Sequence, residues 1–172
     1  GELAYEIHVP NAQLYAAYLA LRRAGQAHGL RLFGSYAVES MRLEKGYRHW
    51  KADLVTEFTP EESGLGRFVH RDKPAFIGKA ALLAASPKKA FVTLVLDCTH
   101  AAAHGGDSIV KGGSVVGTVT SASWGHRVGK NLAMGFIDPQ FAAIGTELAV
   151  EVIGQPIAAE VVADCLYDPE NT

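Results

Sequence analysis

The sequence contains few cysteines, only Cys98 and Cys165 among 172 residues. The two lie far apart and inside apolar runs, so we expect buried thiols rather than a disulfide or a metal-binding pair. Histidine is more frequent, but its seven residues are scattered along the chain. His100 and His104 have helical spacing, yet the two glycines that follow favour a loop over a metal site. The sequence therefore gives little support to a metal centre or a disulfide framework.

Long apolar runs, strong charge and nucleotide-binding glycine motifs are also absent. The longest apolar runs, such as Phe91–Leu96, are far too short to span a bilayer. The formal net charge of −2 gives no electrostatic reason to expect nucleic acid or an anionic membrane as a partner. No Gly-x-Gly-x-x-Gly follows a predicted strand and no phosphate-binding loop occurs, so nucleotide binding has no support. With no signal peptide visible and much alanine and glycine, we expect a cytoplasmic location in a bacterium.

The first part of the chain shows strand-like and helix-like patterns in turn. Glu2–Val9 alternates between apolar and polar residues, which predicts a half-buried strand. Helical spacing then predicts helices over 12–28 and 35–45, separated by a short strand at 30–33. This order predicts an α/β sandwich layer. Because the first residues resemble the interior of a strand, we expect a fragment of a longer protein, with an exposed strand edge or dimerisation.

A helix start and then a domain boundary are predicted toward the middle of the chain. Thr59–Glu62 combines a capping threonine, a proline in the first turn and a glutamate that completes a capping box. A short strand at 67–70 and a short helix at 78–85 follow. Residues 86–89 are polar and break helices, so we place the boundary there, between domains 1–87 and 88–172.

After this boundary the pattern changes to short β-branched runs separated by glycine or proline clusters. Two of these clusters, at 111–113 and 154–155, suit tight hairpins. Six short strands with almost no helix predict a small antiparallel barrel or a Greek-key sandwich, so the whole chain is α+β. The predicted strands are 90–98, 108–110, 114–121, 132–137, 147–153 and 157–166.

The stretch Met41–Trp50 carries the first candidate for ligand binding. The predicted helix ends at Gly46, and Tyr47, Arg48, His49 and Trp50 follow in a short loop. Two aromatic rings and two possible cations in one loop can form the wall of a site for a flat polar ligand. The same pattern also describes an ordinary helix C-terminus whose cations interact with the helix dipole and whose aromatic residues cover a core.

Glu6 is the second candidate. It lies on the polar face of the predicted first strand, and a carboxylate aimed at a pocket can accept paired N–H donors from an aminopyrimidine-type ring. Each such charge-assisted bond contributes about 1.5–3 kcal/mol. The alternative is a strand glutamate that faces solvent.

Four stretches, in this order, resemble the aminomethyltransferase (glycine cleavage T-protein) family: Gly1–Pro10, Met41–Arg48, Thr59–Leu65 and Phe76–Lys79. The later stretches 115–121 and 132–136 are similar to the C-terminal barrel of that family. The resemblance covers essentially the whole chain. Within the family it is greatest to the folate-binding C-terminal region of dimethylglycine and sarcosine dehydrogenases.

This resemblance implies a three-domain arrangement around a central tetrahydrofolate, which receives a one-carbon unit from an aminomethyl or N-methyl donor. It implies that Glu6 holds the pterin ring and that Tyr47 lies near the folate, and we add Trp50 and Arg48 to the candidate folate site. Val38 occupies the position of an arginine in T-proteins, so a folate contact of that type is not expected there. The catalytic aspartate of the family and the FAD domain of the dehydrogenases are expected upstream of Gly1.

Two hypotheses therefore remain at this point. In the first, the chain is the tetrahydrofolate-binding portion of an enzyme, with folate, a small N-methyl amine and the missing N-terminal half as partners. Such a fragment would have no catalytic residue of its own and would not catalyse alone. In the second, it is a non-catalytic folate-binding or structural module of a larger assembly.

Overall fold

The computed structural model describes residues 3–172 and divides the chain into two compact units, Gly1–Gly34 and Ser35–Thr172. The first unit contains helix α1, Asn11–Gly25, followed by a 3-10 turn, Gln26–His28, that ends at Gly29 with φ 71°. The helix predicted over 12–28 is therefore confirmed. No residue of α1 is buried within the chain, so its apolar side chains are open to solvent.

The strand predictions in this unit are wrong for the described residues. Residues 3–10 and 30–33 form no strand. Alternation along a segment predicts only which side chains share a face, whereas a strand also needs a neighbour that satisfies its backbone N–H and C=O groups. No described residue pairs with either segment. The strand that would have offered an exposed edge is thus not formed here.

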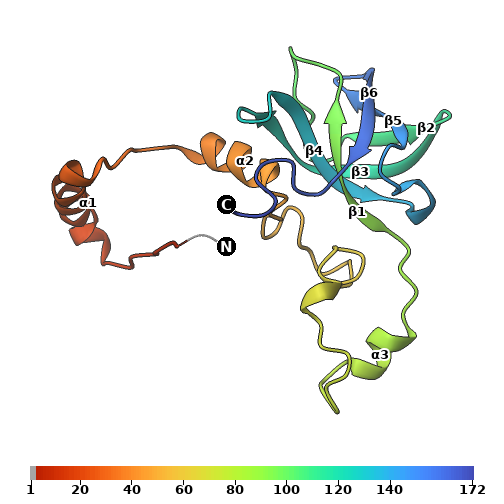
Figure 1. The fold of residues 1–172 in the computed structure, drawn as a ribbon, viewed down its shortest axis with the longest axis horizontal. Coiled ribbons are helices and arrows are strands. Elements are labelled where there is room, and N and C mark those ends of the chain that lie inside the picture. The colour runs from red at the N-terminus through yellow and green to blue at the C-terminus, as the bar shows by residue number, and fades with distance from the viewer. Residues whose placement is uncertain (1–2) are drawn as a thin grey trace. The chain divides into compact units, whose positions relative to one another are not determined.

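The second unit is built on a closed six-stranded antiparallel barrel (Figure 1). Each of the six predicted strands is present, within a few residues at its ends. The order around the barrel is β1-β4-β3-β2-β5-β6. The strands are β1 Ala90–Leu96, β2 Ser108–Lys111, β3 Ser114–Gly125, β4 Lys130–Ile137, β5 Glu147–Val152 and β6 Gln155–Val162. A 3-10 turn, Pro139–Phe141, follows β4. The barrel and the α+β class are confirmed.

Two predicted hairpin turns occur where the sequence places them. Gly112 and Gly113 have φ values of 57° and 80° between β2 and β3, and Ile153 and Gly154 have 49° and 72° between β5 and β6. Two consecutive positive φ values match the twist of antiparallel strands, which explains why glycine occupies three of these four positions. Ile153 is the exception. A β-branched side chain is strained at positive φ.

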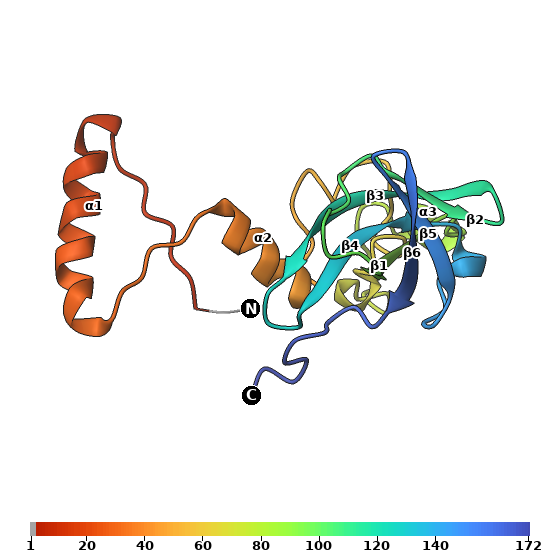
Figure 2. The same ribbon diagram turned by 90° about the horizontal axis from the view of Figure 1, so that it is seen from above.

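The barrel interior is filled by aliphatic side chains, including Leu94, Ile109 and Ile137, which are completely buried. The strand β4 is buried at seven of its eight positions, so it is covered on both faces. Helix α2, Ser35–Glu44, supplies part of that outer cover at the β3–β4 end of the barrel (Figure 2). Leu43 of α2 packs with Leu132 and Met134 in a second core outside the barrel.

Helix α2 ends as the sequence predicts. Gly46 has φ 70°, its N–H donates to the carbonyl of Leu43, and the N–H of Tyr47 donates to the carbonyl of Arg42. These two bonds form a Schellman motif. The chain then turns sharply away from the helix axis, and this turn brings Tyr47 and the residues after it to the outside of the barrel.

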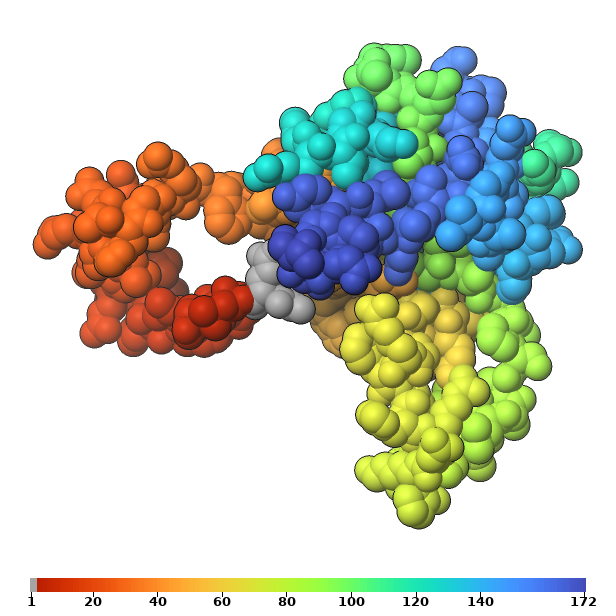
Figure 3. Space-filling view, in the orientation of Figure 1, coloured from red at the N-terminus to blue at the C-terminus, as the bar shows by residue number. Residues whose placement is uncertain are grey.

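Residues 45–89, here called the connecting segment, link α2 to β1. Part of the segment projects from the barrel surface (Figure 3). It contains a 3-10 turn, Gly66–Phe68, in place of the strand predicted at 67–70, and a short helix α3, Lys79–Ala84, close to the prediction. The boundary proposed at 86–89 stays a prediction. No helix among the described residues is long and apolar enough to cross a membrane.

Candidate functional site

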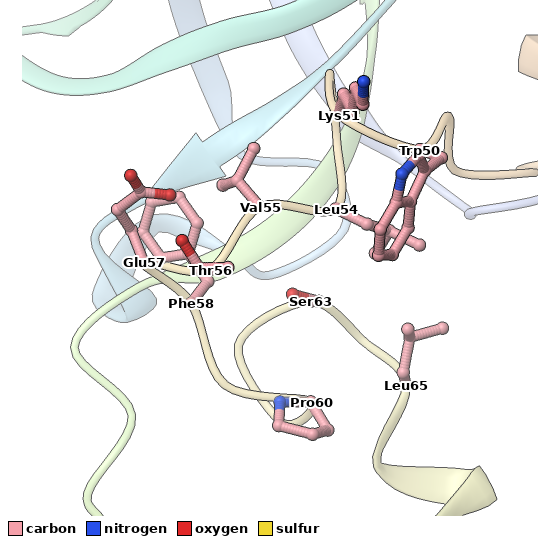
Figure 4. A pocket seen from close by; sticks show the side chains of 10 residues that line it. All are labelled: Trp50, Lys51, Leu54, Val55, Thr56, Glu57, Phe58, Pro60, Ser63 and Leu65. Atoms are coloured by element: carbon pink, nitrogen blue, oxygen red, sulfur yellow. The ribbon is translucent and has the colours of Figure 1, made fainter.

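A pocket of about 470 Å³ opens in the connecting segment. Figure 4 shows Trp50 and Leu65 on one side of it and Glu57 with Phe58 on the other. Most of its wall is apolar, and Lys51 and Glu57 are its charged residues. The lining residues are Trp50, Lys51, Leu54, Val55, Thr56, Glu57, Phe58, Pro60, Ser63 and Leu65.

Trp50 gives this pocket its main flat surface. The residue is 70% exposed although tryptophan is among the most apolar of side chains. It belongs to the Trp50 loop, which we define as residues 47–54. The N–H groups of Asp53 and Leu54 both donate to the carbonyl of His49, and the N–H of Lys51 donates to the carbonyl of Leu54. These bonds close the loop tightly and hold Lys51 at φ 72°.

Asp53 anchors the Trp50 loop to the rest of the unit. Its side chain is completely buried, and Oδ2 accepts hydrogen bonds from the backbone N–H of His49 and from Arg42 Nη1, each at 2.7 Å. Oδ1 accepts from the hydroxyls of Thr120 at 2.5 Å and Ser121 at 2.6 Å. Sequence reasoning missed this residue, because aspartate is common in loops and these side-chain partners lie 11, 67 and 68 residues away.

An aromatic stack holds the opposite side of the pocket. The ring of Phe58 lies on that of Phe136 with centroids 3.7 Å apart, and Phe91 contacts Phe136 edge-on at 5.0 Å. Phe136 is on β4 and Phe91 on β1, so the stack fixes the pocket to the outer face of the barrel. The pocket therefore rests on rigid strands although its lining comes from a connecting segment.

The predicted capping box spans Thr59–Glu62, which includes the lining residue Pro60, and is confirmed. Glu62 Oε2 accepts from the N–H and the hydroxyl of Thr59, both at 2.9 Å, and the Glu62 N–H donates to the Thr59 hydroxyl at 3.3 Å. Glu62 Oε1 accepts from the N–H groups of Lys88 and Lys89. The donors of Thr59 and Lys88 lower the pKa of Glu62 to about 2. The capping box precedes only one turn of chain. Gly64, at φ 67°, ends this turn, so no helix forms there.

Arg48 is not one of the residues that line this pocket, and its side chain is only 6% exposed. Its guanidinium pairs with Asp164 at 2.7 Å, donates to the carbonyls of Ser63 and Gly46, and lies 4.7 Å from the centre of the Phe91 ring. These partners connect the loop after α2, the capped turn and the C-terminal segment. Arg48 thus has protein partners for its donors, and its role as a folate ligand stays a prediction.

Tyr47 is 40% exposed and lines a different, smaller pocket of about 170 Å³ together with Lys45 and Asp164. Lys45 Nζ in this region donates to the carbonyl of Asp168 at 2.6 Å and pairs with its carboxylate at 3.0 Å. Although desolvation opposes the shift, the bond and charge of Asp168 raise the pKa of Lys45. Tyr47 and Trp50, predicted to share a site, therefore line two separate hollows on the second unit.

Glu6 belongs to the first unit, and its side chain is 91% exposed with His8 Nε2 at 3.6 Å. Its carboxylate is chemically free to accept N–H donors from a ligand. Its convergence with Tyr47 or Trp50 stays a prediction, because they belong to the other unit.

The described histidine, cysteine and carboxylate side chains are dispersed. Residues 3–172 contain no cluster of three or more histidine, cysteine or carboxylate side chains able to hold a metal ion. Cys98 is buried, as predicted, Cys165 is half-buried, and both are free thiols.

Comparison with known proteins agrees with this architecture over most of the chain. Residues 1–73 match the family model of the GCVT N-terminal domain, and residues 89–168 match that of the glycine cleavage T-protein C-terminal barrel domain. A crystal structure of the glycine cleavage system aminomethyltransferase T from Bartonella henselae matches with TM-score 0.78 and 26% identity. That match covers 87% of this chain and 43% of the crystallised chain.

Curated relatives match over nearly all of the chain. Human mitochondrial dimethylglycine dehydrogenase is 36% identical over 100% of it, and mouse mitochondrial sarcosine dehydrogenase is 36% identical over 99%. The aminomethyltransferase of Saccharopolyspora erythraea is 37% identical over 97%. The chain spans 20% of the length of these dehydrogenases and 47% of that aminomethyltransferase. Since the models of the GCVT N-terminal domain and of the T-protein C-terminal barrel domain match it in this order, the chain belongs to the aminomethyltransferase (glycine cleavage T-protein) family.

Proposed function

We propose that the chain is the tetrahydrofolate-binding portion of an aminomethyltransferase-like enzyme that transfers a one-carbon unit to tetrahydrofolate. The observation that carries the proposal is the exposed indole of Trp50 on an apolar pocket, in a chain that matches a dimethylglycine dehydrogenase and an aminomethyltransferase over nearly all of its length. An exposed tryptophan beside a hollow is costly in water and is suited to stacking on a flat ring.

The residues present fit a tetrahydrofolate in part. Trp50 would stack on the pterin or the neighbouring aromatic ring, Glu6 would accept hydrogen bonds from the pterin N–H groups, and Tyr47 would contact the folate at its rim. Arg48 would brace the site, because its guanidinium already pairs with Asp164. When bound, tetrahydrofolate supplies the amine that accepts the one-carbon unit, and these residues bind and orient it.

The donor is proposed to be an N-methylglycine such as dimethylglycine or sarcosine, since the dehydrogenases that carry those names align with nearly all of the chain. An FAD domain and the catalytic aspartate would then belong to an upstream part of the same protein. An aminomethyl donor of the glycine cleavage type is the alternative within the family. A cytoplasmic location stays a prediction, and the dehydrogenases named above are mitochondrial.

Calorimetric titration of folinic acid, a stable tetrahydrofolate analogue, into the protein that contains this chain tests the proposal. We expect Trp50→Ala and Glu6→Ala each to weaken binding about tenfold or more, because stacking contributes roughly 1–3 kcal/mol and a charge-assisted bond roughly 1.5–3 kcal/mol. Tyr36, an aromatic residue that is 90% exposed, provides the matched control, and Tyr36→Ala should bind as the wild type does. Absence of binding by the wild-type protein would refute the proposed function.

A further inference from the structure

We propose that Asp53 is a positioning residue that sets the orientation of Trp50 and thereby the affinity of the site for folate. The proposal rests on the proposed function for the ligand, but its structural part, that the carboxylate of Asp53 determines where Trp50 lies, stands on the contacts alone.

The first support is that Asp53, which lies within the Trp50 loop, joins that loop to partners outside it. Asp53 lies at 0% exposure, and its Oδ2 binds both the His49 N–H, next to Trp50, and the guanidinium of Arg42 on α2. The same Nη1 of Arg42 also donates to the carbonyl of Tyr47 at 3.1 Å. Asp53 and Arg42 together therefore fix the backbone on both sides of Arg48 to a rigid helix.

The second support is a β-bulge whose position matches the carboxylate. Val119 pairs with Gly135 and Ser121 pairs with Met134, so Thr120 is an extra residue in β3. In a regular strand the side chains of neighbouring residues point to opposite faces. Because of the bulge, the hydroxyls of both Thr120 and Ser121 reach Asp53 Oδ1, at 2.5 and 2.6 Å.

The third support is backbone strain inside the Trp50 loop. Lys51 has φ 72°, which L residues with side chains adopt at a cost of about 1–3 kcal/mol. Such a conformation persists only when surrounding contacts determine it. The turn that contains Lys51 is closed by bonds to the His49 carbonyl, and His49 is itself held by Asp53. Loss of the carboxylate should release the strained turn and leave the neighbouring indole without a fixed direction.

The test uses the protein that contains this chain, labelled with 5-fluorotryptophan. Trp50 gives one ¹⁹F resonance, identified as the signal absent from Trp50→Phe. We expect Asp53→Ala to shift or broaden this resonance and to weaken folinic acid binding at least tenfold, as measured by calorimetry well below the melting temperature. Asp53→Asn keeps the shape and most of the hydrogen bonds, so it should recover most of the affinity and the wild-type resonance.

Glu44→Ala is the matched control. Glu44 is also a buried carboxylate, 1% exposed, but its Oε1 accepts from the N–H groups of Arg127 and Val128 in the β3–β4 turn. We expect it to lower the melting temperature as Asp53→Ala does, with less than a twofold change in affinity. Equal affinity losses in the two variants would mean that Asp53 acts only through stability, and an unchanged Trp50 resonance in Asp53→Ala would overturn the proposal.

Two further outcomes are separable. If Asp53→Ala does not fold, Thr120→Val is the substitute variant, because it removes one of the four hydrogen bonds to the Asp53 carboxylate. Thr120→Val should shift the Trp50 resonance away from its wild-type position, and an unshifted resonance would overturn the proposal. If wild-type protein binds no folinic acid, the proposed function fails, whereas the resonance still reports whether Asp53 positions Trp50.

Discussion

Replacement of Glu62 by glutamine should destabilise the second unit in a pH-dependent way. Glu62 is 8% exposed, and its carboxylate accepts bonds from Thr59, Lys88 and Lys89. In Glu62→Gln, one carboxylate oxygen becomes an NH₂ group. In either orientation this group faces N–H donors, those of Thr59 or those of Lys88 and Lys89. The variant therefore loses the charge and leaves at least one buried donor without a partner.

The magnitude follows from the pKa. The backbone donors lower the pKa of Glu62 from 4.5 to about 2, and each pKa unit corresponds to about 1.4 kcal/mol, which sets an upper bound of roughly 3 kcal/mol. Because the glutamine side chain keeps one oxygen as an acceptor for part of these donors, we expect a loss of about 2 kcal/mol. Since the folded pKa is depressed, the stabilisation is present above pH 4.5 and is lost as the pH falls toward 2.

Urea unfolding of wild type and Glu62→Gln between pH 7 and pH 3 measures this effect. We expect the free energy of unfolding of the variant to be lower by about 2 kcal/mol at pH 7, and the gap to shrink to less than half at pH 3. Glu170, which is exposed, provides the control, and Glu170→Gln should change little at any pH. A gap that stays constant over this range would refute the reasoning, because the loss would then not depend on the charge.

Three more substitutions test other parts of the structure. Arg48→Lys keeps the positive charge but not the several N–H donors of the guanidinium. We therefore expect faster amide hydrogen exchange around Asp164 and a free energy of unfolding in urea that is lower by about 1–2 kcal/mol. Unchanged exchange would contradict the bracing role of Arg48. Ile153→Asn should raise the free energy of unfolding by about 1 kcal/mol, because asparagine tolerates the φ of 49°; a loss of stability would show that the turn is not strained. Gly117→Ala should cost more than about 3 kcal/mol, since its Cβ would lie 2.2 Å from a carbonyl oxygen, whereas Gly34→Ala meets nothing within 4 Å and should change little; equal melting temperatures for the two would contradict the close packing.

The barrel could be predicted from the sequence because its signals are local. Each strand is a β-branched run and each tight turn contains glycine, so pattern and turn chemistry agree. The end of α2 at Gly46 was predictable for the same reason. The strand expected at 2–9 was not formed over its described part, because alternation cannot show whether a neighbouring strand exists to accept its hydrogen bonds.

The candidate site was predicted less completely. Trp50 was identified from its place after the helix, and the structure puts it on a pocket. Tyr47 and Arg48 were identified by the same pattern, but one lines another hollow and the other is paired with Asp164. Which way a loop side chain points is decided by distant partners. For Asp53 those partners include two hydroxyls on β3, and nothing in the local sequence reveals them.

The extra residue in β3 means that strand length, and not only residue identity, determines the geometry beside Trp50. Deleting Thr120 would restore a regular ladder with β4 and could leave the barrel closed. Ser121 would then take the place of the deleted residue, and only one hydroxyl would remain for Oδ1 of Asp53. A sequence with this deletion would still contain Asp53, Ser121 and Trp50. Loss of one residue from β3 would nevertheless alter how the indole of Trp50 is held.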